Sequence, residues 1–415
     1  MNVNSAAQLL QTGFRTALGA SSAIAELLNN PQKLADILAK PPRSPEQLLL
    51  DLAARGESIE QEAHKFGETF LSGGSHHLKP PQYIERAGEQ CFLQPYDIKG
   101  TNLYGFILEG SLHKLQAVCD TYLNQPAKGE VEYRPAMHYV VLTFGTMDSL
   151  SSTNKPDSEK GYVLEEEVVF WILTMVGKQV GPAFVVERLA WFMPYVFVNN
   201  SPVLISGREV YGISKQLGSF QIPKPPQPPD LFTLETLLWK HFIPDIQAQD
   251  ERLIEVCRVG KEVSFKPNKT WDTPQELVNE ILELLFDNNG RIEIPGFSLP
   301  LNIFDYLTHT AVPVVFLKQF RDAEDGSRAC YQAIVENLMK MYKYHSGRIL
   351  SFGSLGDQFE VTLYDYASHP IVNDLGLRPR GTKPGESVRL PVKLSFWINF
   401  NFTVENGTTV WKAPS

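Results

Sequence analysis

The sequence has few cysteines, no excess of basic residues and no long hydrophobic run. Its four cysteines are Cys91, Cys119, Cys257 and Cys330, and none belongs to a Cys-x-x-Cys pair. This pattern indicates neither a disulfide-rich scaffold nor a structural zinc site. We therefore expect four reduced thiols and no bound metal.

The charge balance narrows the classes of partner. The chain has 38 Lys and Arg against 47 Asp and Glu, a formal net charge of −9, whereas a nucleic-acid-binding surface needs a basic face. Its longest apolar runs, such as 168–176 and 189–198, fall well short of the ~20 residues of a membrane-spanning helix. No basic cluster precedes an apolar segment near Met1, which favours a cytoplasmic address. We expect no nucleic-acid partner and no membrane span.

The common catalytic motifs are absent as well. The sequence contains no GxxxxGK[ST] phosphate loop, no GxGxxG, no GxSxG and no HExxH. It therefore lacks the signatures of four large enzyme classes. No set of His, Cys, Asp and Glu has the spacing of metal ligands. We expect the protein to use no cofactor.

The chain contains a helical beginning and a β-rich remainder. In residues 1–90, Ser44-Pro45-Glu46-Gln47 is typical of a helix N-terminus, and the Gly/Ser-rich stretch 72–75 is typical of a linker. This part is predicted to be a helical extension, with 91–415 as the main domain. A decorated insertion is expected near 224–300, where a proline-rich passage precedes a capped helix at 273–290.

Strands dominate the predicted main domain. Its strand-like segments are dense in β-branched and aromatic residues; they are 137–144, 168–176, 195–198, 359–366 and 392–403. One helix is capped by Ser111 and places five residues on one face; they are Leu112, Leu115, Val118, Cys119 and Tyr122. Because the elements do not follow a regular βαβ series, an α+β fold with a mainly antiparallel barrel or sandwich is favoured.

One segment carries a candidate for chemistry. Within Gly207–Gly218, Lys215 stands among glycines and apolar residues, where the chain leaves an apolar strand. Burial can force a lysine to be neutral, and a neutral amine can form an imine with a ketone. By residue type alone, the alternative is a solvated lysine at a strand end.

This segment resembles the active-site motif of the acetoacetate decarboxylase superfamily, in which Gly-Arg-Glu is followed six residues after the Glu by the Schiff-base lysine. Upstream, 161–176 is similar to the family's Tyr-x-Glu segment and strand, which carry an active-site glutamate. The register points to Glu167, with Glu165 and Glu166 as alternatives if it shifts. Downstream, 331–336, 368–370 and 396–400 are similar to the closing half of longer members. The resemblance covers about 91–405.

The resemblance implies a fold and a site. The fold is a mainly antiparallel, cone-like β-barrel that holds Lys215 in a buried cavity, generally assembled into homo-oligomers, here in a long form with the N-terminal helical extension. Lys215 and Glu167 are its expected catalytic residues. The other pocket residues that we expect are Tyr211, Ile213, Gln216, Arg208 and Glu209. Core packing is the alternative for Tyr211 and Ile213, and support of the turn beneath the lysine is the alternative for Arg208 and Glu209.

The sequence departs from the family pattern at three places. Gln216 replaces the second of two consecutive lysines, and Ser214 replaces a proline. The strand at 137–144 has no carboxylate where decarboxylases place an acidic residue. The family's substrate-binding arginine has no counterpart by motif, although Lys99 or Arg134 can supply a positive charge.

These observations predict a Schiff-base-forming lyase that acts on a small keto or β-keto acid, by decarboxylation or related carbon–carbon bond chemistry. Two alternatives stay open. One is an aldolase-dehydratase of the same superfamily, which the missing second lysine and the missing acidic partner favour. The other is a catalytically inactive member that serves as a small-molecule binding or assembly module.

Overall fold

The computed structural model describes residues 82–84, 91–259, 313–352, 358–377 and 383–414 except single positions within them, the pairs 291–292, 301–302 and 355–356, and positions 276 and 379. The chain divides between Arg86 and Ala87, and everything below concerns the unit Ala87–Ser415. The predicted extension at 1–90 and the predicted helix at 273–290 lie almost wholly outside the described residues. Both stay predictions, as does the domain boundary at residue 90.

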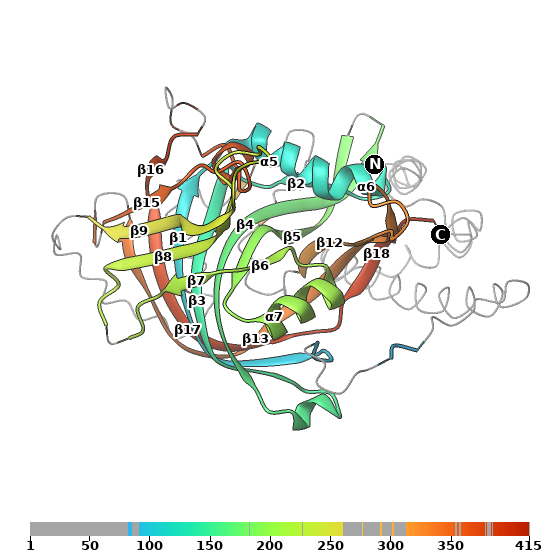
Figure 1. Ribbon diagram of the computed structural model, residues 1–415, viewed down its shortest axis with the longest axis horizontal. Helices are drawn as coiled ribbons and strands as arrows, with labels where there is room; N and C mark the ends of the chain where they lie inside the picture. The colour runs from blue at the N-terminus through green and yellow to red at the C-terminus, as the bar shows by residue number, and fades with distance from the viewer. Residues whose placement is uncertain are drawn as a thin grey trace, which may run out of the picture. The chain divides into compact units, whose positions relative to one another are not determined.

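The described unit consists mostly of strands (Figure 1). Its larger sheet has 11 strands. They are β1 (Tyr96–Glu109), β2 (Glu132–Pro135), β3 (Tyr139–Ser152), β4 (Val163–Val180), β5 (Ala183–Val198), β6 (Lys215–Leu217), β12 (Pro313–Arg321), β13 (Ala329–Phe352), β14 (Leu355–Gly356), β17 (Leu394–Val404) and β18 (Thr408–Lys412). All five segments predicted as strands coincide with or overlap described strands.

The strand order of the larger sheet is β2-β4-β3-β1-β17-β13-β12-β5-β6, and β14 and β18 also pair with β13. Because β4 pairs with β5 as well as with β3, the hydrogen-bonded circuit from β4 through β1, β13 and β5 returns to β4. Such closure leaves few unpaired edges. The cone-like shape that the resemblance implies stays a prediction.

The prediction of a mainly antiparallel sheet is confirmed with one correction, because the sheet is mixed. Two of its pairings are parallel, β5 with β6 and β5 with β12. The connection after β5 explains the first: the chain leaves at Val198, passes through a helical crossover and returns beside β5 in the same direction, as parallel pairing requires.

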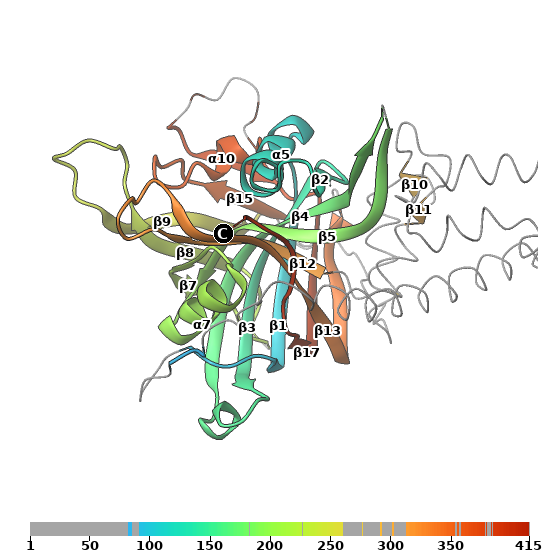
Figure 2. The ribbon, with the colours of Figure 1, turned by 90° about the vertical axis from the view of Figure 1, so that its right-hand side faces the viewer.

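A second sheet has five strands in the order β16-β15-β9-β8-β7. Their bounds are β7 (Ser219–Gln221), β8 (Leu231–Leu238), β9 (Gln249–Arg258), β15 (Phe359–Leu363) and β16 (Val388–Pro391). The first part of the predicted insertion near 224–300 therefore supplies β8 and β9 (Figure 2). Two short strands, β10 (Arg291–Ile292) and β11 (Leu301–Asn302), pair with each other.

The helical segments are short. They are α5 (Leu112–Cys119), η1 (Asp120–Asn124), α6 (Gln125–Ala127), η2 (Asp157–Glu159), α7 (Ser201–Ser206), η3 (Gly207–Tyr211) and α10 (Ile371–Asp374). The predicted helix after Ser111 is confirmed as α5, with Leu115 and Val118 buried. Leu112 and Tyr122, expected on the same buried face, are 51% and 44% exposed. Within the described residues, no helix combines the length and apolarity needed to cross a membrane.

Aromatic side chains join the two sheets. Phe232 of β8 is fully buried. The centroid of its ring lies 5.0 Å from that of Tyr104 and 5.2 Å from that of Phe106, both on β1. Both pairs are edge-to-face, a geometry that adds about 0.5–1.5 kcal/mol beyond the burial of each ring. A second buried cluster includes Met193 and Phe402 and lies around the cavity described next.

Candidate active site

The segment from Asn200 to Gly212 carries the chain from β5 to β6. Asn200 begins α7, because its side-chain oxygen accepts a 3.0 Å hydrogen bond from the amide of Val203. η3 continues α7, and Gly212 ends it in the left-handed region with φ +83°, where glycine is favoured. A Cβ there would lie 2.3 Å from the Cα of Lys318. Gly212 therefore allows the turn and its close packing on β12.

Lys215 is the first residue of β6 and is 9% exposed. Its Nζ lies 3.3 Å from Oε1 of Glu165, and both side chains are buried. Gly207 makes room for the lysine stem, since a Cβ at this position would lie 2.7 Å from Lys215 Cδ. The main chain is also tied, because Arg208 Nη1 donates to the carbonyl of Lys215 at 3.1 Å. Arg208 thus fixes the main chain of Lys215, and Gly207 leaves the space that its side chain occupies.

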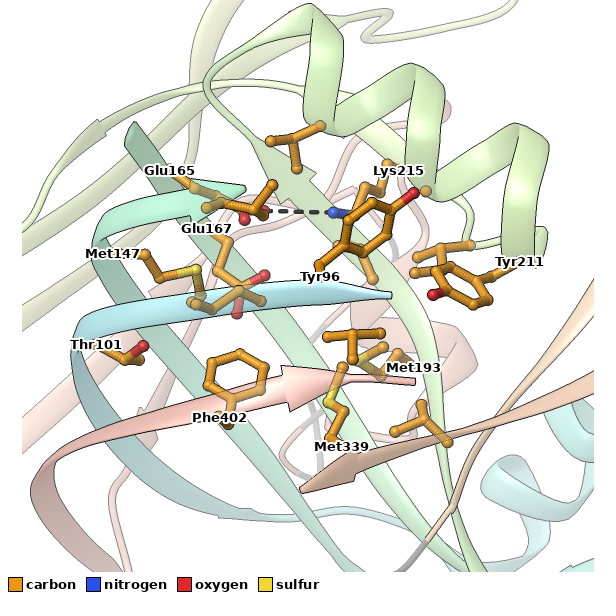
Figure 3. A pocket seen from close by; sticks show the side chains of 18 of the residues that line it. Tyr96, Thr101, Met147, Glu165, Glu167, Met193, Tyr211, Lys215, Met339 and Phe402 are labelled. Carbon is orange, nitrogen blue, oxygen red and sulfur yellow. Dashed lines mark hydrogen bonds and ion pairs between the residues drawn. The ribbon is translucent and has the colours of Figure 1, made fainter. Parts of the chain in front are cut away.

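Two glutamates on β4 face the same cavity. Glu165 and Glu167 are two residues apart on one strand, so they lie on one face of the sheet, and both line the cavity with Lys215 (Figure 3). Glu167 pairs with Gly145 of β3. A Cβ on Gly145 would lie 3.3 Å from Glu167 Cγ, so the glycine gives the glutamate space. Glu166 faces the opposite way, and its Oε1 lies 3.9 Å from Lys224 Nζ.

The cavity has a volume of about 280 Å³. Side chains from β1, β3, β4, β5, α7, η3, β6, β12, β13 and β17 line it. Among these lining residues, Lys215 is the only Lys, Arg or His, and Glu165 and Glu167 are the only carboxylates. The remainder are mostly apolar, so the charges lie in an environment of low polarity that strengthens their interactions.

The electrostatics of the cavity leave Glu167 protonated near neutral pH. Burial raises the pKa of Glu167, the negative charge of Glu165 raises it further, and Lys215 partly opposes both, so that the pKa is about 8. Two neighbouring carboxylates commonly separate in this way, one ionised and one neutral. Glu165 is the carboxyl group that lies beside Lys215 Nζ. The cavity thus holds a lysine nitrogen and two carboxyl groups, of which Glu167 is protonated near neutral pH.

The structure brings together four of the predicted site residues. Lys215, Glu167, Tyr211 and Ile213 all line the cavity, and so does Glu165, the alternative of the sequence register. The cavity therefore has two glutamates of β4 in its wall, although the strand segment at 137–144 has no carboxylate. Catalytic roles for Lys215 and Glu167 stay predictions.

The other three expected pocket residues, Gln216, Arg208 and Glu209, do not line the cavity. Side chains alternate along a strand, so Gln216 lies on the face of β6 opposite to Lys215. There its Oε1 lies 2.8 Å from Nε2 of the buried His369. Arg208 supports the main chain of Lys215, which agrees with the alternative reading of that residue.

The two basic residues suggested for substrate charge also lie outside the cavity lining. Lys99 is paired with Asp97 at 2.9 Å, and Arg134 with Glu132 at 2.7 Å. Among the described residues, no group of three or more His, Cys, Asp or Glu side chains is placed to hold a metal ion.

Sequence reasoning missed most of the cavity wall. Its unpredicted residues include Tyr96, Met147, Trp171, Trp191, Met193, Met339, Met341, Phe400 and Phe402. They come from strands that are far apart in the chain, and an apolar residue in a strand carries no signal of which buried face it takes. The prediction was confined to one contiguous segment and one strand for this reason.

Comparisons with known proteins give matches among solved structures only. No protein-family model matches the chain, and no curated protein matches it significantly. The chain is similar to acetoacetate decarboxylase from Legionella pneumophila, with 12% identity and a TM-score of 0.48 over 81% of this chain and 94% of that one. It is also similar to the enduracididine biosynthesis enzyme MppR, with 11% identity and a TM-score of 0.45 over 82% and 98%. An acetoacetate decarboxylase-like enzyme from Sphingomonas wittichii RW1 is similar with 11% identity and a TM-score of 0.41 over 82% and 100%.

Proposed function

We propose that this protein is a Schiff-base-forming lyase that acts on a keto or β-keto acid, with Lys215 as the nucleophile. The observation that carries the proposal is the juxtaposition in one apolar cavity of a buried lysine amine and two carboxyl groups. Lys215 Nζ and Glu165 Oε1 are 3.3 Å apart, close enough for the carboxylate to take a proton from the ammonium group.

The first step is imine formation. Once Lys215 has given a proton to Glu165, its nitrogen lone pair attacks the ketone carbon and a carbon–nitrogen bond forms. Glu167, with a pKa of about 8, is a carboxylic acid at neutral pH and protonates the carbonyl oxygen. The oxygen then leaves as water together with one of the two protons on nitrogen, and the other proton stays, which gives the iminium ion.

The second step breaks a carbon–carbon bond. In a β-keto acid, the bond to the carboxylate breaks, carbon dioxide leaves, and the bonding electrons move through the β-carbon to the iminium nitrogen, which gives an enamine. Glu167, which the first step leaves as a carboxylate, repels the substrate carboxylate when it is buried nearby, and this repulsion favours departure of the carboxylate as neutral carbon dioxide. A proton from a carboxyl group to carbon, followed by addition of water, releases the ketone and the lysine amine.

The test is borohydride trapping with freshly prepared, acetone-free acetoacetate, followed by peptide mass measurement. Borohydride donates hydride to the imine carbon and makes a stable secondary amine. We expect the wild-type protein to carry the adduct on Lys215 and Lys215→Met to carry none. Lys224→Met, at a lysine that is outside the cavity lining, is the matched control and should retain the adduct.

The mass of the trapped group reports the chemistry. An isopropyl group shows that carbon dioxide was lost before reduction, whereas a group that retains its carboxylate shows imine formation without decarboxylation. An undiminished adduct on the Lys215→Met protein, or none on the wild-type protein with any keto acid tried, would contradict the proposal.

A further inference from the structure

The cavity around Lys215 is larger and more apolar than a small keto acid needs. Building on the proposed function, we infer that the substrate is a keto acid that carries an apolar chain or ring beyond its reacting carbonyl and carboxylate. The argument uses the volume of the cavity, the chemistry of its wall and the position of its charged groups.

The volume sets the size of the occupant. An apolar protein cavity of about 150 Å³ holds benzene, which has about six non-hydrogen atoms. At the same packing, the cavity of about 280 Å³ holds about eleven non-hydrogen atoms, whereas acetoacetate supplies about seven. The difference corresponds to an apolar chain of about four carbons, or to a small ring, beyond the reacting group.

The wall of the cavity suits an apolar tail. Four of the seven methionines of the chain line it, and methionine side chains adapt their shape to apolar and aromatic groups. Two tryptophans, Trp171 and Trp191, and the phenylalanines Phe400 and Phe402 complete much of the remaining surface.

The charged groups are gathered on one side. In Figure 3, Glu165 and Lys215 lie together at one side, while Met193, Met339 and Phe402 lie at the other, with Glu167 between. A keto acid whose carbonyl meets Lys215 therefore has its carboxylate near the same group of charges. Its chain extends toward the methionines.

Most of the other polar side chains that line the cavity already have hydrogen-bond partners in the protein. The hydroxyl of Tyr96 donates a 2.7 Å hydrogen bond to the carbonyl of Phe92, and that of Tyr211 donates a 2.8 Å hydrogen bond to the carbonyl of Glu405. Ser206 Oγ accepts from the amide of Phe92 at 2.8 Å. Thr101 is the exception, because its Oγ1 is buried without a hydrogen-bond partner and can meet one polar atom of the occupant. The tail that fits is therefore mainly hydrocarbon.

A homologous series of β-keto acids tests the inference. Borohydride trapping on wild-type protein is compared for acetoacetate, 3-oxohexanoate, 3-oxooctanoate and 3-oxododecanoate, each over a range of concentrations. Each buried methylene strengthens binding about fourfold when fully desolvated. We expect the half-saturating concentration to fall at least tenfold from acetoacetate to 3-oxooctanoate, and no further improvement with 3-oxododecanoate, because the cavity is then full.

A variant locates the tail. Met339→Trp narrows the apolar side of the cavity and should reduce the preference for 3-oxooctanoate over acetoacetate at least fivefold. Met175→Trp, at a methionine of β4 that does not line the cavity, should leave the preference unchanged. Far-ultraviolet circular dichroism checks that both variants are folded, and the wild-type series decides the question even if they are not.

The outcomes separate this inference from the proposed function. Adducts of equal affinity along the whole series would overturn the inference while leaving the Schiff-base chemistry intact. A preference that weakens with chain length would overturn it as well. Absence of any adduct with every member would overturn both.

Discussion

Glu167 is the residue whose protonation state the cavity controls most strongly. Its pKa of about 8 means that it is a proton donor below that pH and a second negative charge above it. We expect turnover of a β-keto acid to decline as the pH rises through about 8. Glu167→Gln should lower turnover about 100-fold at pH 7, within the range that a general acid contributes. Glu166→Gln, on the opposite face of β4, is the matched control and should keep activity near that of the wild-type protein.

The raised pKa of Glu167 also couples stability to pH. In the unfolded chain a glutamate ionises near pH 4.5, so between about 4.5 and 8 the folded protein binds a proton that the unfolded chain has lost. The free energy of unfolding therefore falls as the pH rises through this window. Urea unfolding at pH 5, 6.5 and 8 should show a smaller loss for Glu167→Gln than for the wild-type protein. Equal pH dependence of the two proteins would contradict burial of the ionisable carboxyl.

Gly207 permits the lysine stem to pass close to the main chain. Since a Cβ there would lie 2.7 and 2.8 Å from Lys215 Cδ and Cε, Gly207→Ala must displace the side chain and move Nζ away from Glu165. We expect the rate of borohydride trapping to fall at least tenfold, because a displacement of about 1 Å can cost about 100-fold in rate. Gly326→Ala, at a position with open space around its Cβ, should trap at the wild-type rate.

At the scale of elements, the alternation of side chains along β6 places the proposed nucleophile on one face of the strand and a structural contact on the other. Lys215 faces the cavity, and Gln216 faces His369, whose ring packs 5.7 Å from that of Phe197 on the neighbouring β5. With Nε2 donating to Gln216, Nδ1 accepts from the hydroxyl of Ser368 at 2.9 Å. A neutral histidine thus ties the loop before α10 to the back of the lysine strand.

Acid should lower the free energy of unfolding, because His369, the residue that contacts Gln216 of β6, is buried as a neutral side chain. Burial lowers the pKa of His369 to about 4, below the value of 6.5 in the unfolded chain, so the unfolded chain gains a proton first as the pH falls. Stability is then lost between pH 6.5 and 4, by about 3 kcal/mol in total for this group. Urea unfolding of His369→Gln should show a correspondingly smaller loss across that window. The exposed His345→Gln serves as the control, and an unchanged slope in His369→Gln would contradict the assignment.

The strands and helices were easier to predict from the sequence than the contacts between them. The apolar run at 168–176 and the alternating segment at 392–403 predicted β4 and β17 because residue types and periodicity are local properties. The sequence leaves the Glu165 contact open, because Glu165 and Glu167 share one face of the strand and a register shift of two residues exchanges them. The expected role of Gln216 in the pocket assumed that sequence neighbours share a face, which a strand does not allow. The segment 207–213 is not a strand, so Tyr211 and Ile213 can both face the cavity with Lys215.

At the scale of the whole described unit, the site depends on long-range pairing. The cavity wall draws on β1, β4, β5, β12, β13 and β17, which the circuit of pairings from β4 back to β4 brings around one space. None of these pairings follows from a local pattern, so the size and apolarity of the cavity were not predictable. A cytoplasmic address and a homo-oligomeric state stay predictions.

Because so many strands contribute to the wall, an occupant of the cavity should stabilise the unit as a whole. An apolar group that is covalently attached to Lys215 is exposed to water in the unfolded chain and buried only in the folded one, and burial contributes about 0.8 kcal/mol for each CH2 group. We expect 3-oxooctanoate, reduced onto Lys215 with borohydride, to raise the Tm of the wild-type protein by several degrees, measured by calorimetry after the free ligand is removed. Lys215→Met treated identically should show no increase, since nothing remains bound. An equal rise in both proteins would mean that the stabilising adduct lies elsewhere, and no rise in the wild-type protein despite a confirmed adduct would mean that the strands around the cavity do not unfold together.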